Sequence, residues 1–114
     1  MTRRAFDVRW AEGAVRDLEG IVRFIAIDSP LNAGKVVERL RTRTKGLAVL
    51  PERGRVVPEL AAFGIQAYRE LVVRPYRVLY RVKGRTVLVL AVLDARRDLE
   101  DLLLERLVSG GTRG

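Results

Sequence analysis

The sequence predicts an α+β domain in which a helical hairpin packs against one face of an antiparallel-type sheet. Apolar residues recur at helical spacing through residues 11–47, which indicates two consecutive helices. Strand-like patterns separated by two tight turns then fill residues 68–94, which indicates a three-stranded antiparallel meander. Adding a first strand, a short strand before the meander and a last helix gives the order β-α-α-β-β-β-β-α.

The chain begins with a short strand at residues 5–10, because Phe6, Val8 and Trp10 alternate with charged residues and form one buried face. A helix follows from Ala11, with an apolar stripe on one side and charged residues on the other. The predicted stripe consists of Ala14, Val15, Leu18, Ile21, Val22 and Ile25.

Ser29 and Pro30 separate the first helix from the second, with serine as the N-cap and proline at the first helical position. Because the link is so short, the two helices must lie side by side and antiparallel. The second helix ends before Pro51, and its stripe consists of Ala33, Val36, Val37, Leu40, Thr44 and Leu47.

A loop covers residues 51–64, which hold two prolines and two glycines. We expect one short strand in it at residues 55–58. This strand should lie at an edge of the sheet, because Pro58 has no N–H group to donate to a neighbour.

The meander consists of strands at residues 68–74, 76–82 and 86–93. Pro75 marks the first turn, and Lys83 with Gly84 forms the second, where glycine supplies a positive φ. The last strand is apolar from Val87 onward, so we expect it in the middle of the sheet, as the deepest part of the core.

The chain is predicted to close with a helix at residues 99–107, for which Asp98 is the N-cap and leucines form the inner face. We expect residues 1–108 to form a single domain, since this length is enough to bury a core, and residues 109–114 to form a flexible tail.

The composition narrows the possible classes of function. The 114 residues include neither cysteine nor histidine, so thiolate and imidazole metal sites and histidine general bases are excluded, and we expect no metal or cofactor. No apolar run approaches the ~20 residues of a membrane helix, and no signal-peptide pattern is present, so we expect a soluble cytoplasmic protein. The net charge of +8 favours a nucleic acid or an acidic protein as partner, although a GC-rich genome that encodes arginine freely also explains it.

Basic side chains gather on the meander and just after it. Arg77 and Arg81 share one face of the second meander strand, and we expect Arg69 to join them from the neighbouring strand. Such a row suits phosphates or carboxylates, because each guanidinium offers a rigid fork of donors. The alternative is that these side chains lie over apolar sheet and pair with nearby acids. The candidates for binding a target or partner are Arg69, Arg77, Arg81, Arg96 and Arg97.

Acidic and aromatic residues of the meander also have two interpretations each. Glu70 and Asp94 can act as bases or as ion-pair partners of nearby arginines. Tyrosines can stack on nucleic-acid bases, but Tyr76 and Tyr80 share a face with valines. Core packing is therefore favoured for these two, with the hydroxyl groups reaching partners at the rim.

The layout and several short motifs resemble the ParE/RelE superfamily of bacterial type II toxin–antitoxin toxins, over roughly residues 6–107. The motifs are the PERGR loop at residues 51–55, Tyr68-Arg69-Glu70-Leu71, Pro75-Tyr76-Arg77-Val78-Leu79-Tyr80 and Ala95-Arg96-Arg97-Asp98. The resemblance implies that a cognate antitoxin, ParD-like or a similar small DNA-binding protein, wraps the toxin in a hetero-oligomer. It also implies that the pair represses its own operon through the antitoxin.

The superfamily divides by target. RelE-like members cleave mRNA in the ribosome and need a base, an acid and cations. By resemblance, Arg77, Arg69 and Arg96 fall at or near their cationic positions, and these three would be the catalytic residues of a nuclease. Leu71 stands at a second lysine position, and a leucine around Leu102 stands where many of them have a tyrosine.

No acid/base pair therefore survives, and guanidinium groups stay protonated near pH 7. This pattern resembles ParE, whose members inhibit DNA gyrase and serve plasmid stabilisation. We expect the basic sheet face and the C-terminal region to engage gyrase or its DNA, and the surface of the helical hairpin to take an acidic antitoxin. The alternatives are a RelE-like ribosome-dependent endoribonuclease and a non-toxic homologue that only binds antitoxin.

Overall fold

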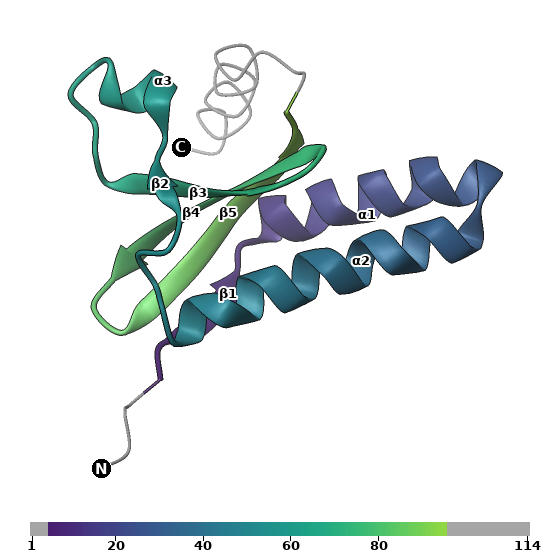
Figure 1. Ribbon diagram of the computed structural model, residues 1–114, viewed down its shortest axis with the longest axis horizontal. Helices are drawn as coiled ribbons and strands as arrows, with labels where there is room; N and C mark the ends of the chain where they lie inside the picture. The colour runs from purple at the N-terminus through teal and green to yellow at the C-terminus, as the bar shows by residue number, and fades with distance from the viewer. Residues whose placement is uncertain (1–4, 96–114) are drawn as a thin grey trace.

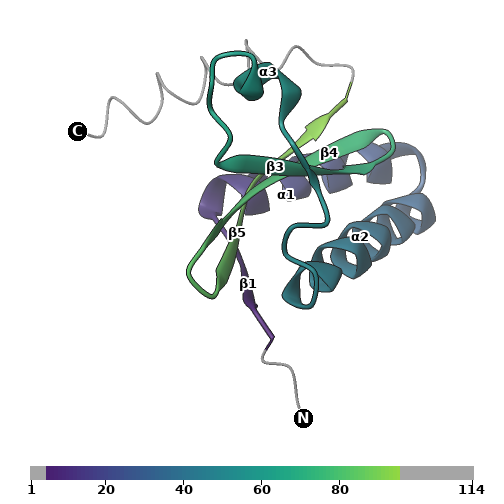
Figure 2. The same ribbon diagram turned by 60° about the vertical axis from the view of Figure 1, so that its left-hand side comes forward.

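The computed structural model describes residues 5–95 and confirms the predicted α+β architecture. Two long helices cover one side of a sheet, and a short helix lies on the other side (Figures 1 and 2). The predicted last helix and tail lie outside the described residues. The elements are β1 (Asp7–Trp10), α1 (Glu12–Asp28), α2 (Pro30–Lys45), η1 (Gly46–Ala48), β2 (Arg55–Val56), α3 (Pro58–Ala61), β3 (Tyr68–Val73), β4 (Tyr76–Lys83) and β5 (Thr86–Asp94).

The sheet has five strands in the order β1-β5-β4-β3-β2. Strands β2 to β5 pair antiparallel, as predicted, whereas β1 pairs parallel to β5, with Val8 opposite Val87 and Trp10 opposite Val89. A tight turn can join only antiparallel strands. The helical hairpin and the other strands lie between β1 and β5 in the sequence, and this long connection allows the two strands to run parallel. Strand β5 is thus flanked on both sides, as its apolar sequence predicts.

The helical hairpin forms as the sequence predicts, with one correction. The side-chain oxygen of Ser29 accepts a hydrogen bond from the N–H of Asn32 at 3.1 Å, and Pro30 opens α2. Val15, which the prediction placed in the buried stripe, is 41 % exposed. One residue turns a helix by about 100°, so Val15 lies well to the side of its fully buried neighbour Ala14.

The main core lies between the hairpin and the sheet. Leu18, Ile21 and Ile25 of α1 pack against its buried residues, together with Trp10 from β1. Tyr80 is completely buried in it, and its hydroxyl accepts a hydrogen bond from the N–H of Gly54 at 2.8 Å. The predicted core packing of Tyr80 is confirmed, but the partner of its hydroxyl, Gly54, is buried and does not lie at the rim. Burial raises the pKa of the hydroxyl.

A second, smaller core lies on the opposite face of the sheet, and helix α3 helps to form it. Val57 is fully buried there beside Leu79 and Leu93, and Leu60 of α3 packs against them. The sequence analysis missed α3 and extended the edge strand to Pro58. Pro58 instead opens the helix, a position where its missing N–H does no harm.

The meander differs from its prediction in two details. The five residues from Tyr76 to Tyr80 are all buried, so β4 rather than β5 is the most continuously buried strand. Gly84 has a positive φ, as predicted, with a value of 60°, but Lys83 pairs with Thr86, so the turn consists of Gly84 and Arg85.

None of the helices within residues 5–95 is long and apolar enough to cross a membrane.

Candidate functional site

Arg77 lies on the face of β4 that points away from the helical hairpin. Its partner across the β3–β4 pairing is Val72, and its side chain crosses the sheet towards α3. Arg77 as a whole is only 7 % exposed. A guanidinium buried to this extent needs partners for its donors and its charge, because transfer from water is otherwise strongly unfavourable.

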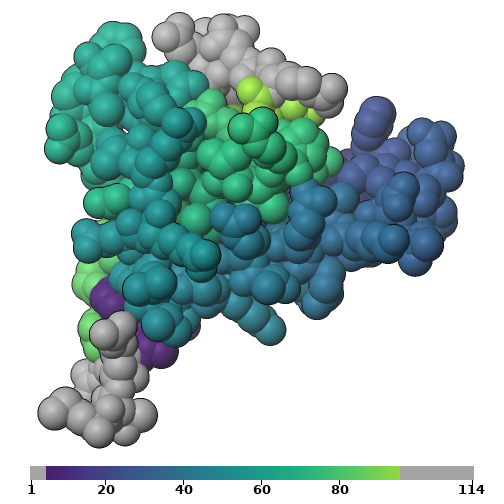
Figure 3. All heavy atoms as spheres, in the orientation of Figure 1, coloured from purple at the N-terminus to yellow at the C-terminus, as the bar shows by residue number. Residues whose placement is uncertain are grey.

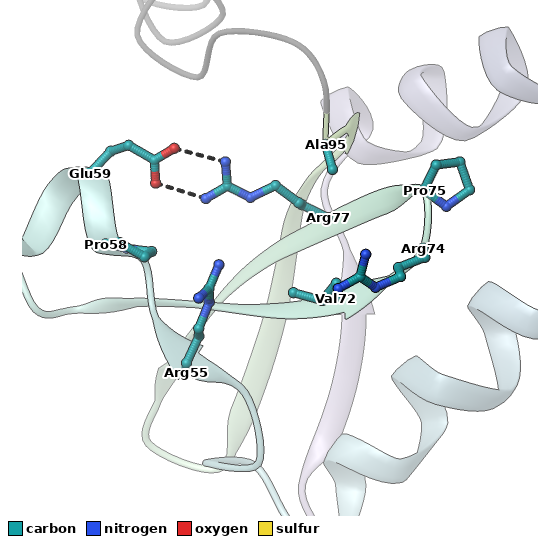
Figure 4. Close-up of a pocket in the computed structure, with 8 residues that line it drawn as sticks. All are labelled: Arg55, Pro58, Glu59, Val72, Arg74, Pro75, Arg77 and Ala95. Carbon is teal, nitrogen blue, oxygen red and sulfur yellow. Dashed lines mark hydrogen bonds and ion pairs between the residues drawn. The ribbon is translucent and has the colours of Figure 1, made fainter.

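Two carboxylates supply those partners. The terminal nitrogens of Arg77 donate to the two carboxylate oxygens of Glu59, each at 2.8 Å, and Figure 4 shows this paired contact. The Nε of Arg77 donates to Glu70 at 2.6 Å, and a terminal nitrogen lies 2.5 Å from the same oxygen. The second oxygen of Glu70 accepts from the Nε of Arg55 at 2.6 Å. Two arginines and two glutamates thus form one network, which we call the Arg77 network.

The hydrogen bonds between Arg77 and Glu59 favour the charged form of both groups. Hydrogen bonding to Arg77 lowers the pKa of Glu59 below its usual 4.5, against the opposing effect of burial. Hydrogen bonding to Glu59, and then to Glu70, raises the pKa of Arg77. Glu59 is therefore an ionised carboxylate with both oxygens occupied, which makes it a poor acceptor for a further proton.

An open groove of about 860 Å³ lies over this network. Arg55 and Arg74 are exposed, and they place two further guanidinium groups along the groove (Figure 4). Such a groove can take an anionic group, since cations outnumber carboxylates along it. Its lining consists of Arg55, Pro58, Glu59, Val72, Arg74, Pro75, Arg77 and Ala95.

Arg69 does not join Arg77, contrary to the prediction. Residues paired directly across neighbouring strands share a face, and Arg69 pairs with Tyr80 on the hairpin side of the sheet. There its guanidinium donates to the carbonyl oxygen of Gly54 at 2.8 Å and lies 3.7 Å from the carboxylate of Glu52. Its contacts stabilise the loop after α2.

The predicted row of arginines is thus broken within the described residues. Arg81 shares the face of Arg77, as predicted, but its guanidinium lies over the ring of Tyr68, 5.6 Å from the centroid. Arg96 and Arg97 lie outside the described residues.

The two acids considered as bases have different surroundings. Glu70 is 1 % exposed and acts as the ion-pair partner of Arg55 and Arg77, the second of its two interpretations. Asp94 ends β5 opposite Tyr76 and lines a separate groove beside α1.

Sequence reasoning missed Glu59 and Arg55 as members of the site. It also expected no acid/base pair beside Arg77. Glu59 does place a carboxylate beside Arg77 in the groove, and both of its oxygens accept hydrogen bonds from Arg77. The Pro58-Glu59 pair was an available signal, since proline followed by an acid is typical of a first helical turn. The sequence does not show, however, that this turn lies opposite Arg77, because its position depends on the path of the loop across the sheet.

The comparisons with known proteins identify the fold. A chain of the chromosomal ParDE toxin–antitoxin system of P. aeruginosa matches with a TM-score of 0.65 and 23 % identity, covering 81 % of this chain and 98 % of that one. A chain of the RelBE2 toxin–antitoxin complex of Mycobacterium tuberculosis matches with a TM-score of 0.55 and 26 % identity, covering 82 % and 94 %. The α+β fold is therefore that of the ParE/RelE type.

The sequence comparisons then identify the family. Residues 8–99 match the family model of the ParE toxin of type II toxin–antitoxin systems. Toxin RelE2 of Caulobacter vibrioides is 36 % identical over 91 residues, covering 79 % of this chain and 96 % of its own. Y4kP of Sinorhizobium fredii is 35 % identical over 98 residues, covering 84 % and 95 %. The chain belongs to the ParE toxin family and is a type II toxin–antitoxin toxin of the ParE/RelE superfamily.

Proposed function

We propose that this toxin inhibits DNA gyrase, as ParE toxins do by the resemblance described above, and does not cleave RNA. The observation that carries the proposal is the Arg77 network. Cleavage at a 2′-hydroxyl needs a group that accepts its proton and another that donates one to the leaving oxygen. In the network, the two oxygens of Glu59 are occupied by Arg77 and those of Glu70 are divided between Arg77 and Arg55.

The protonation states of Glu59 and Arg77 also argue against RNA cleavage. A general base works best with a pKa near the operating pH, and the pKa of Glu59 is shifted further from it. Arg77 can stabilise negative charge but cannot exchange protons near neutral pH, since its pKa is raised. The surface is thus suited to holding an acidic or anionic macromolecule.

The proposal includes a cognate antitoxin that neutralises the toxin in a hetero-oligomer in the cytoplasm. Support comes from the solved structures of similar fold, which are a ParDE system and a RelBE2 complex. Support also comes from an exposed apolar end of the helical hairpin, where Phe24, Ile27 and Leu31 are each at least 70 % exposed. An antitoxin that carries apolar side chains within an acidic segment fits this end of the basic toxin.

The decisive experiment adds the purified toxin, in parallel, to a gyrase supercoiling assay and to a ribosome-bound mRNA cleavage assay. We expect supercoiling to be inhibited and the message to stay intact. Addition of the protein encoded by the neighbouring small gene should relieve the inhibition. Cleaved message with unaffected supercoiling would contradict the proposal.

A ribosome-dependent endoribonuclease is the second candidate, and the open groove is the observation that favours it. Three guanidinium groups line the groove, which suits a phosphodiester, and one relative is named toxin RelE2. Arg74→Ala tests this candidate with little effect on the fold, because Arg74 is exposed and lies outside the Arg77 network. A nuclease should lose cleavage in this variant, whereas a gyrase inhibitor should show none to lose.

A third possibility, a homologue that only binds antitoxin, makes a different prediction. Expression of the chain alone should then leave cells unharmed. The proposed gyrase inhibitor should instead arrest growth when it is expressed without antitoxin.

A further inference from the structure

Helix α2 concentrates positive charge on its outer surface. Its five basic residues, which we call the α2 cations, are Lys35, Arg39, Arg41, Arg43 and Lys45, and Glu38 is its only acid. All of them except Arg43 are exposed. The neighbouring α1 has the opposite balance, with four acids and two arginines. In Figure 3, α2 lies open along the lower part of the molecular face that the view shows.

The α2 cations are not neutralised within the described part of the chain. The ion pairs of residues 5–95 involve Arg9, Arg55, Arg69 and Arg77, and none involves α2. Arg39 donates to the carbonyl oxygen of Arg74, a contact that leaves its charge unpaired. The two groups of cations therefore differ in their partners. In the Arg77 network the arginines pair with carboxylates, whereas the α2 cations form no ion pair with a described residue.

The spacing of these residues makes the charge unfavourable for the isolated helix. Lys35 and Arg39, Arg39 and Arg43, and Arg41 and Lys45 are each four residues apart, a separation that brings like charges close together on a helix. An external polyanion would relieve this repulsion.

The side chains that this surface lacks indicate which kind of polyanion it binds. Protein interfaces have apolar or aromatic centres, yet residues 35–45 contain no exposed large apolar side chain. Single-stranded nucleic acids are bound through aromatic stacking, and α2 has no aromatic residue. The phosphate backbone of a duplex requires only cations and polar groups. We propose that the exposed face of α2 binds the phosphate backbone of duplex DNA without reading its sequence.

The dimensions agree with this proposal. The helix rises about 1.5 Å per residue, so Lys35 and Lys45 lie roughly 15 Å apart along its axis. Duplex DNA carries one charge per about 1.7 Å, or roughly nine phosphates over that length. The four exposed α2 cations therefore extend over a length along which a duplex offers several phosphates. The inference does not depend on gyrase inhibition, because the chain itself makes the contact.

The test measures binding of the full-length toxin to a fluorescein-labelled DNA duplex by anisotropy over a series of salt concentrations, with no gyrase present. The test variant combines Lys35→Gln, Arg41→Gln and Lys45→Gln. The matched control combines Arg16→Gln, Arg23→Gln and Lys83→Gln, which are exposed cations outside α2. Each variant removes three positive charges from the net charge of +8, so the two differ only in where the charge is lost.

We expect the α2 variant to bind more weakly, with a shallower salt dependence. Each lost phosphate contact lowers the slope of log K against log salt by about 0.9, so the slope should fall by roughly 2.7, and by less than about 1 in the control. Equal weakening in both variants would show an effect of net charge alone and would overturn the proposal. So would absence of DNA binding by the unaltered toxin.

A parallel titration with polyglutamate separates DNA from an acidic protein partner. Loss of polyglutamate binding in the α2 variant, with DNA binding unchanged, would overturn the proposal in favour of a protein ligand. Circular dichroism of both variants verifies that they are folded. The single substitution Lys35→Gln, which should lower the slope by about 0.9, provides the same test with minimal alteration of the helix.

Discussion

At the scale of single residues, the chemistry of this toxin depends on how Arg77 is paired. A buried arginine held by two carboxylates contributes to the stability of the fold, because removing any partner leaves an uncompensated charge in the protein. Loss of toxicity after substitution of Arg77 therefore does not by itself identify a catalytic residue. Stability has to be measured beside activity.

The first prediction concerns Arg77→Ala. This change leaves Glu70, which is 1 % exposed, with Arg55 as its remaining ion-pair partner and removes the paired contact of Glu59, so we expect the free energy of unfolding to fall by about 3–5 kcal/mol. The control is Arg81→Ala on the same strand and face, where loss of a contact over the Tyr68 ring should reduce stability by only about 0.5–1 kcal/mol. Urea unfolding measures both. Equal effects would mean that the Arg77 network adds no special stability.

The second prediction concerns pH. The pKa of Glu59 lies below 4.5 in the folded protein, so the unfolded state takes up the proton first as the pH falls. The stability from its pairing with Arg77 is complete above about pH 4.5 and is lost as the pH falls through the lower, folded pKa. The stability difference between wild type and Glu59→Gln should therefore shrink as the pH falls below 4.5.

Urea midpoints measured between neutral and acidic pH test the Glu59 prediction. Glu38→Gln is the control, because Glu38 lies on the exposed side of α2 and forms no ion pair with a described residue. A difference between wild type and Glu59→Gln that stays constant with pH would argue against coupling of Glu59 to Arg77.

At the scale of elements, the loop between α2 and β3 brings the site together. Arg55 and Glu59 come from this loop, and it is fastened where the Gly54 N–H donates to the buried Tyr80 hydroxyl. The contact is tight enough to exclude any side chain at residue 54. A Cβ atom there would lie 2.5 Å from the backbone oxygen of Glu70 and 2.7 Å from the Tyr80 hydroxyl oxygen.

The third prediction compares alanine at two glycines. Gly54→Ala must displace backbone, so we expect a loss of stability of about 1–3 kcal/mol or more. Gly34 lies inside α2 with no atom near its added Cβ, so Gly34→Ala should raise stability by about 0.5–1 kcal/mol. Thermal and urea unfolding of both variants measure the opposite signs. A tolerated alanine at residue 54 would show that the loop can move away from the sheet.

At the scale of the whole molecule, the sheet is shared by two cores. The hairpin packs on one face and α3 on the other, and β4 contributes side chains to both. Because the same strands bear both cores, we expect the layers to unfold together as a single domain.

The fourth prediction tests that cooperativity. Trp10, the only tryptophan, reports on β1 and the hairpin core by fluorescence, while far-ultraviolet circular dichroism reports mainly on α1 and α2. Urea transitions followed by the two signals should coincide within error. Separate midpoints would contradict the prediction of one domain.

The sequence alone determined the elements whose pattern is local. Helical periodicity, the Ser29-Pro30 boundary and the strand alternation of β4 depend on neighbouring residues, and they predicted the hairpin and the meander correctly. The same patterns placed Arg77 on the face of β4 opposite to that of Tyr76 and Tyr80. Family membership was also accessible, since the order of short motifs survives in the chain.

The tertiary structure alone decided what Arg77 touches. Only the path of the loop across the sheet brings Glu59 within hydrogen-bonding distance of Arg77, and it brings Arg55 to the second oxygen of Glu70. The strand register likewise placed Arg69 on the other face, because pairing across a turn fixes faces that alternation within one strand cannot. Long-range packing and register, which no local pattern encodes, therefore decided that Arg77 pairs with carboxylates, one of the two alternatives that the sequence left open, and that Arg69 lies apart from it.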